Sequence, residues 1–133
     1  MAAPGCARDP AGVTSTHDLG RRFEDAAARH LERSGWRILA RNVRFRRKEI
    51  DLVVRRGDVV AFVEVKGRRG AGYGHPLEAV TWRKRREIES VAAWWIARFG
   101  EAGVSYRFDA VSVETTPGGR AVVRHAEDAW RPG

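Results

Sequence analysis

Two short apolar segments, residues 49–54 and 59–66, carry charged side chains at the ends that a hairpin would bring together. The segment 55–58 between them reads Arg-Arg-Gly-Asp, which is typical of a tight turn, so the two segments are predicted to pair as antiparallel strands. The second segment begins apolar on both faces, as a strand inside a sheet does. Charged groups at the edge of such a sheet need partners. These charged residues are Glu49, Asp51, Glu64 and Lys66.

The register of this hairpin decides whether the acidic groups meet. The partners that we predict across it are Arg55 with Asp58, Asp51 with Phe62, and Glu49 with Glu64. Asp51 and Glu64 are then diagonal neighbours on one face, roughly 7–8 Å apart, and Lys66 points the same way. A shift by one residue would move Asp51 to the opposite face from Glu64.

Facing carboxylates are destabilising unless a cation or a proton lies between them. Mg²⁺ prefers carboxylates, water and phosphate oxygens as ligands, so Asp51 and Glu64 are candidate ligands of Mg²⁺ or Mn²⁺. A metal held there can polarise a phosphate and activate water, and Lys66 can orient that water or stabilise the transition state. The alternative is an ordinary strand end, in which Lys66 forms an ion pair with Glu64 or Asp51.

The excess of positive charge surrounds these acidic residues. The chain has a net charge of +8, and residues 41–86 hold 14 Lys and Arg against 5 Asp and Glu. A concentrated positive charge is typical of nucleic-acid binding, although a solvated basic face is the alternative. Candidate contacts lie in the glycine-rich segment after Lys66, which is otherwise a flexible connector, and early in the second helix, which is otherwise a solvated face. They are Arg68, Arg69, Tyr73, Arg83 and Lys84.

The periodicity of apolar residues predicts an α/β protein with the order α-β-β-β-α-β-β, a mixed central sheet flanked by helices. Arg107 and Asp109 are predicted to anchor the last strands, and three tryptophans, Trp82, Trp94 and Trp95, to lie in the core or an interface. The expected helices are residues 16–34, ended by Gly35, and 77–99, and the expected strands are 36–45, 49–54, 59–66, 105–113 and 121–124.

The domain organisation predicted from composition is a flexible tail, residues 1–17, followed by a single domain, residues 18–133. There is no apolar run long enough to cross a membrane, and the tail lacks the apolar centre of a secretory signal. The single cysteine, Cys6, has no partner for an internal disulfide. These features favour a cytoplasmic protein.

Several motifs in order resemble those of the YraN family of bacterial proteins and, more widely, the restriction-endonuclease-like nucleases with an Asp…(Asp/Glu)-x-Lys signature. The resemblance covers about residues 18–130. The motifs are Gly20, Glu24, Ala27 and Ala28; Asn42-Val43-Arg44; Glu49-Ile50-Asp51-Leu52; Phe62-Val63-Glu64-Val65-Lys66-Gly67-Arg68; and Arg107-Phe108-Asp109.

The resemblance implies a restriction-endonuclease-like fold and a metal-dependent DNA endonuclease, with branched or damaged DNA as a candidate substrate. It makes Asp51 and Glu64 metal ligands, Lys66 the catalytic lysine, and Glu24 a helix-borne acid that approaches the metal. Glu49 is then a further ligand or a group behind the ligands. Lys48 stands where the family pattern has glycine, and we expect it to contact a phosphate or to alter the turn into the strand.

Two alternatives to an enzyme remain open on the sequence. The chain could be a nucleic-acid-binding module that keeps the nuclease fold without catalysis. A homodimer or another assembly could form through tryptophan side chains, with Trp94, Trp95 and Trp130 as the candidates.

Overall fold

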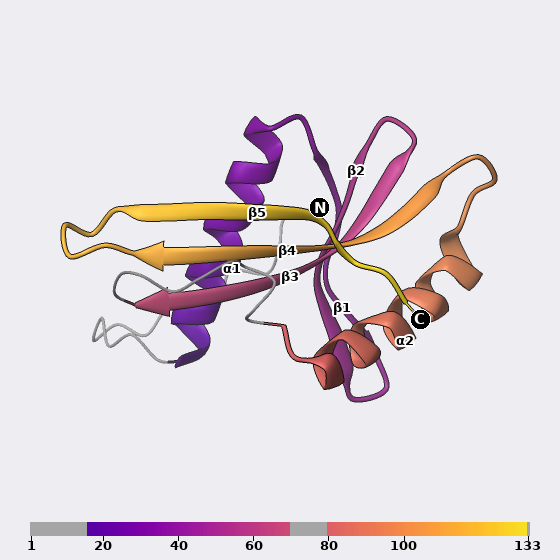
Figure 1. Ribbon diagram of the computed structural model, residues 1–133, viewed down its shortest axis with the longest axis horizontal. Coiled ribbons are helices and arrows are strands. Elements are labelled where there is room, and N and C mark those ends of the chain that lie inside the picture. Colours follow the sequence, from indigo (N-terminus) through magenta and orange to yellow (C-terminus); the bar gives the residue numbers. More distant parts are fainter. Residues whose placement is uncertain (1–15, 70–79, 133) are drawn as a thin grey trace, which may run out of the picture.

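The computed structural model describes residues 16–69 and 80–132, and the elements follow the predicted order (Figure 1). The predicted tail, residues 1–17, lies outside the described residues except for its last two. The predicted α/β class is confirmed. The elements are α1 (Thr16–Arg33), β1 (Arg37–Phe45), β2 (Lys48–Arg56), β3 (Val59–Arg69), α2 (Trp82–Phe99), β4 (Ser105–Thr115) and β5 (Ala121–Trp130).

The five strands form one mixed sheet in the order β1-β2-β3-β4-β5. Only β3 and β4 pair in parallel, and α2 makes the crossover between them. The sheet twists strongly, so that β1 and β2 run steeply across the direction of β4 and β5 in Figure 1. The pairing of β2 with β3 extends only from Arg56 and Val59 to Leu52 and Val63, although both strands continue beyond it.

Each face of the sheet has its own apolar core. The core under α2 includes Phe62 and Trp95, whose rings meet edge to face with centroids 5.7 Å apart. The core under α1 includes Leu31 and Val63, both fully buried. Burial on both faces explains why β2 and β3 read as nearly continuous apolar runs.

The register predicted for the β2–β3 hairpin is wrong by two residues. Arg56 pairs with Val59 and Leu52 with Val63, so the two central turn residues are Gly57 and Asp58. Gly57 has φ +60, and a two-residue hairpin turn with glycine first needs such a backbone. Because a shift of two residues preserves the side-chain alternation, the acidic residues of β2 and β3 can still meet.

The second helix begins later than the sequence pattern predicts. Thr81 is its N-cap, with an extended backbone and a side chain that accepts a hydrogen bond from the Lys84 N–H at 3.1 Å. The helix therefore begins at Trp82, whereas Leu77, the predicted start, lies outside the described residues. At the end of α1, Gly35 has φ +92, as a helix-ending glycine often does.

A glycine allows α1 to lie close to β3. A Cβ atom built on Gly67 would be 1.7 Å from Cδ2 of Phe23, so the Phe23 ring occupies the space above the glycine. Phe23 directly precedes Glu24, and Gly67 directly follows Lys66. This contact therefore positions two candidate site residues relative to each other.

A buried ion network joins β4 to β5, as predicted for Arg107 and Asp109. Asp109 is fully buried and accepts hydrogen bonds from Arg107 Nε at 3.0 Å, His125 Nε2 at 2.7 Å and the Asp128 N–H at 2.9 Å. Burial opposes ionisation, but the hydrogen bonds from His125, Arg107 and Asp128 prevail and lower the pKa of Asp109. Arg107 also forms an ion pair with Glu127.

Candidate metal centre

Three carboxylates converge near one end of the sheet. One oxygen from each of Glu24, Glu49 and Asp51 lies within 4.8 Å of the other two. Glu24 comes from α1, whereas Glu49 and Asp51 are two residues apart on β2. Oxygen ligands from carboxylates suit Mg²⁺ and Mn²⁺. The predicted ligands Asp51 and Glu49 and the helix-borne Glu24 are thus brought together, although Glu64 is not among the three.

Asn42 on β1 connects two of these carboxylates. Its side-chain Nδ2 donates hydrogen bonds to Oε1 of Glu24 at 3.0 Å and to Oε1 of Glu49 at 2.9 Å. Its backbone has φ +51, a conformation that asparagine tolerates better than most residues. Sequence reasoning did not identify Asn42 as a site residue, although it is in the Asn-x-Arg motif.

Glu64 meets the cluster through Asp51. The pairing of β2 with β3 ends at Leu52 and Val63, and beyond it the Val65 N–H donates to Asp51 Oδ2 at 2.7 Å. The carboxyl groups of Asp51 and Glu64 are hydrogen bonded to each other. The predicted facing pair, Glu49 with Glu64, is therefore wrong, and Glu49 pairs with Arg44 of β1 instead.

Burial and mutual repulsion alter the acidity of these groups. Burial raises the pKa of Glu64 to about 9, and the charge of Asp51 adds to this rise. Burial also raises the pKa of Asp51, against hydrogen bonds from Glu64 and the Val65 N–H that lower it. The pKa of Glu24 is raised by burial, although its hydrogen bond with Asn42 lowers it. Without a cation, the Asp51–Glu64 pair therefore holds a proton at neutral pH.

Two lysines lie near the Asp51–Glu64 pair. Lys84 of α2 places Nζ 3.9 Å from Oε2 of Glu64, whereas the sequence suggested that it contacts phosphate. Lys66 is exposed, and its charge favours ionisation of Glu64. Among the described residues no ion pair joins Lys66 to a carboxylate, so the predicted alternative of a salt-bridged strand end is not observed.

The residues predicted to contact nucleic acid lie on more than one element of the fold. Arg68 and Arg69 are the last residues of β3, not part of a loop, and Tyr73 lies outside the described residues. Lys48 begins β2 opposite Phe45, so a lysine in place of the family glycine leaves the strand regular.

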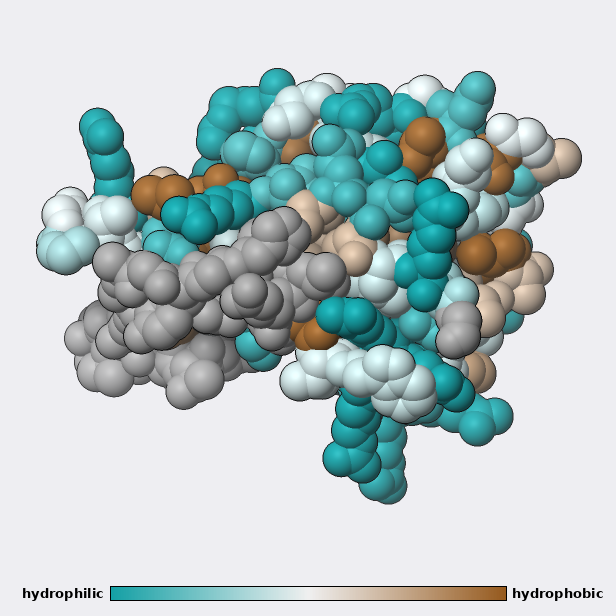
Figure 2. Space-filling model, viewed as in Figure 1, coloured by the Kyte–Doolittle hydropathy of each residue, from teal (hydrophilic) through white to brown (hydrophobic). Residues whose placement is uncertain are grey.

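A hollow of about 660 Å³ includes Lys48 and Arg83 in its lining. Figure 2 shows long hydrophilic side chains projecting at the lower edge, where Figure 1 draws the start of α2 and the β1–β2 turn. The lining of this hollow also includes Arg86, Glu87 and Glu89, so it combines basic and acidic side chains.

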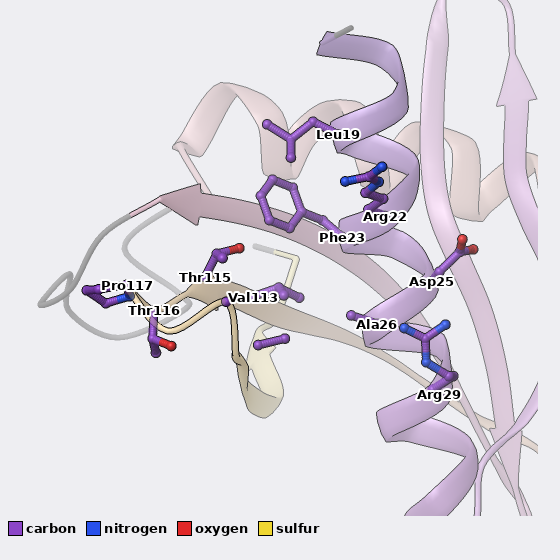
Figure 3. Close-up of a pocket in the computed structure, with 12 residues that line it drawn as sticks. Leu19, Arg22, Phe23, Asp25, Ala26, Arg29, Val113, Thr115, Thr116 and Pro117 are labelled. Carbon is purple, nitrogen blue, oxygen red and sulfur yellow. The ribbon is translucent and has the colours of Figure 1, made fainter. Parts of the chain in front are cut away.

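A pocket of about 700 Å³ lies elsewhere, between α1 and the β4–β5 turn. Figure 3 shows Leu19 and Phe23 pointing from α1 into this space, while Asp25 points away from it. The converging carboxylates are not part of its lining, which is largely apolar. We therefore assign the candidate chemistry to the acidic cluster.

The fold and this cluster define a mixed α/β protein with a candidate divalent-metal centre between its first helix and its central strands. Residues 23–113 match the model of the Uncharacterised protein family UPF0102, and the chain belongs to that family, also called the YraN family. A UPF0102 protein of Symbiobacterium thermophilum is 49% identical over 112 residues, which cover 84% of this chain and 95% of the relative.

Further relatives have the same family name. A UPF0102 protein of Nocardia farcinica is 47% identical over 86% of this chain and 91% of its own length. One from Geobacter sulfurreducens is 43% identical over 91% of this chain and 96% of its own length. In the described part of the chain, neither helix has the length and apolar character that a membrane crossing requires.

Proposed function

We propose that the protein is a Mg²⁺- or Mn²⁺-dependent DNA endonuclease that hydrolyses phosphodiester bonds. The observation that carries this proposal is the convergence of Glu24, Glu49 and Asp51 within 4.8 Å. Glu64 continues the acidic surface by its hydrogen bond with Asp51, and Lys66 follows on the same strand. The residues match the acid-acid-lysine pattern of restriction-endonuclease-like nucleases.

Each residue has a definite task in this proposal. Glu24, Glu49 and Asp51 would hold the cation, and Glu64 would join them once it loses its proton. A divalent cation supplies charge for the phosphate oxygens and acidifies a bound water molecule. Lys66, exposed beside Glu64, would donate to the phosphate or orient the attacking water. Asn42 keeps the carboxylates of Glu24 and Glu49 aligned.

Labelled single-stranded, duplex, flapped and four-way-junction DNA, incubated with purified protein and Mn²⁺ or Mg²⁺, tests the proposal. We expect metal-dependent cleavage that falls at least about 100-fold in Asp51→Asn and Lys66→Ala, because each removes a group that acts on the transition state. Glu101 is an exposed carboxylate paired with Arg55, so the variant Glu101→Gln serves as the control and should leave cleavage unchanged. Equal cleavage by all variants would identify a contaminating nuclease.

A non-catalytic nucleic-acid-binding module is the second candidate, and one observation favours it. The Asp51–Glu64 pair is satisfied without a metal by the Val65 N–H, a shared proton and nearby Lys84. This candidate predicts binding that weakens steeply with salt, with no metal-dependent rise in melting temperature. A rise with Mn²⁺ that Asp51→Asn abolishes would exclude it.

Asn42 should matter for metal binding more than for folding. Asn42→Asp and Asn42→Gly both tolerate the backbone at φ +51, but both remove the amide that bridges Glu24 and Glu49. We expect each to weaken Mn²⁺ binding by about 10- to 100-fold, the usual effect of losing a group that orients metal ligands. Isothermal calorimetry gives the affinity, and thermal melting reports folding. Wild-type affinity in Asn42→Asp would reduce Asn42 to a turn-forming residue.

A further inference from the structure

The first residue of α2, Trp82, exposes its aromatic side chain to solvent. Trp82 is 68% exposed, which is unusual for so large an apolar group, so of its two predicted places, the core or an interface, the core is wrong. Trp95, by contrast, is 8% exposed and lies in the core. The exposed ring forgoes the stabilisation that burial of a large apolar surface would give, and its face is available for stacking.

The basic residues that follow Trp82 divide into two groups. Lys84 points to Glu64, and Arg85 turns back to donate to the Val80 carbonyl at 3.1 Å. Arg83 and Arg86 are exposed, and both line the hollow of about 660 Å³. The outward group therefore stays available to a ligand while the inward group supports the fold and the acidic site.

Arg86 and Trp82 form one surface. The guanidinium of Arg86 lies 4.8 Å from the centroid of the Trp82 ring, a cation–π distance. The hollow beside them also includes Lys48, which directly precedes Glu49 of the acidic cluster. Thus the aromatic face of Trp82 lies beside a hollow that two arginines and a lysine line together with Glu87 and Glu89.

We propose that Trp82 is a stacking platform for an unpaired nucleobase, with Arg83, Arg86 and Lys48 holding the phosphates of the same strand. This inference rests on the proposed function and adds the kind of substrate: DNA with a single-stranded segment next to the bond that is cut. Proteins that bind single strands combine a basic groove with aromatic side chains on which bases stack. In a duplex, both faces of each base are already covered by neighbours.

A protein partner for Trp82 is the competing explanation, and the surrounding charge argues against it. The exposed residues Arg83 and Arg86 next to Trp82 are cationic, although Glu87 and Glu89 also line the hollow, where Glu89 accepts a hydrogen bond from Trp130 at 3.0 Å. Residues 41–86 hold 14 Lys and Arg against 5 Asp and Glu. The cores of protein interfaces are depleted in charged residues, whereas nucleic-acid surfaces are enriched in basic ones.

The test is nucleic-acid binding without metal, so that cleavage plays no part in the result. Fluorescence anisotropy with a labelled 20-residue oligo-dT and with a duplex of equal length compares the wild type, Trp82→Ala and Trp82→Phe. Loss of one stacked base corresponds to an affinity about 5- to 150-fold lower. We expect this loss for oligo-dT in Trp82→Ala, a smaller loss in Trp82→Phe, and a change below about twofold for the duplex.

Salt dependence separates the ring from the arginines. Trp82→Ala should leave the slope of log affinity against log salt unchanged, because stacking releases no counterions. Arg83→Gln combined with Arg86→Gln should lower that slope by about 1.4, as expected for two phosphate contacts on a single strand. Phe99→Ala, which removes the exposed aromatic residue at the other end of α2, is the matched control and should bind like the wild type.

Three results would overturn the inference. They are equal losses for single strand and duplex in Trp82→Ala, unchanged affinity for both, or a change in oligomeric state by light scattering without a change in DNA affinity. The last would assign Trp82 to a protein interface. Because the assay contains no metal, its result does not depend on whether the protein is a nuclease. If the wild-type protein cleaves DNA but Trp82→Ala binds oligo-dT as tightly as the wild type, only the stacking inference is rejected.

Discussion

Replacing Asp109 by alanine is expected to lower the free energy of unfolding by about 3–5 kcal/mol, the effect of removing one partner from a buried ion pair. Asp109 is fully buried, and its loss leaves Arg107 and His125 without their shared acceptor. The Asp128 N–H loses its acceptor as well. Urea denaturation at pH 7, followed by tryptophan fluorescence, measures the change.

The exposed end of the same network provides the matched control. Glu127 is paired with Arg107 and Arg56, but its side chain is 48% exposed. Glu127→Gln should therefore lower the free energy of unfolding by less than about 1 kcal/mol. Asp109→Asn, which keeps the shape, covers the case in which the alanine variant does not fold. Equal losses for Asp109→Asn and Glu127→Gln would contradict the structural role assigned to Asp109.

The free energy of unfolding of the metal-free protein should contain a pH-dependent contribution from Glu64. Burial raises its folded-state pKa to about 9 from the ordinary 4.5. Between these values the folded state holds a proton that the unfolded state has lost. The stability from Glu64 is therefore complete below pH 4.5 and falls as pH rises towards 9, by at most about 1.4 kcal/mol per pH unit.

Glu64→Gln isolates this contribution, because glutamine cannot ionise but keeps a similar shape. The difference in unfolding free energy, variant minus wild type, should increase steadily from pH 5 to pH 9 in the presence of a chelator. Glu101→Gln controls for the loss of one negative charge at an exposed position. A difference that does not change with pH would show that Glu64 holds no extra proton in the folded protein.

The element order could be predicted because periodicity and turn residues are local properties of the chain. The sequence also predicted that Asp51 and Glu64 share one face of the hairpin, although as diagonal neighbours in a register that is wrong. The predicted hairpin places Arg55 opposite Asp58, whereas the observed hairpin has Gly57 and Asp58 as its two turn residues. The two registers differ by two residues, so every side chain stays on the same face of the sheet. The error therefore changed the partners but not the site.

Other features depend on the fold as a whole and could not be predicted locally. The role of Asn42 requires α1 to lie beside β1 and β2, which no spacing in the sequence indicates. The apolar character of Trp82 suggests a place in the core or an interface, but the exposure of its ring depends on where the helix begins, and Thr81 caps the helix directly before it. With Thr81 as the cap, Trp82 is in the first turn, where one side of a helix faces water.

The close approach of Phe23 to Gly67 fixes the distance between α1 and β3 next to the candidate metal centre. Phe23, whose ring rests on β3, directly precedes Glu24 of α1, and Gly67 directly follows Lys66 of β3. A tilt of α1 against β3 would therefore change the distance between Glu24 and Lys66. An apolar contact outside the acidic cluster would in this way set the spacing of the carboxylates in the proposed metal site.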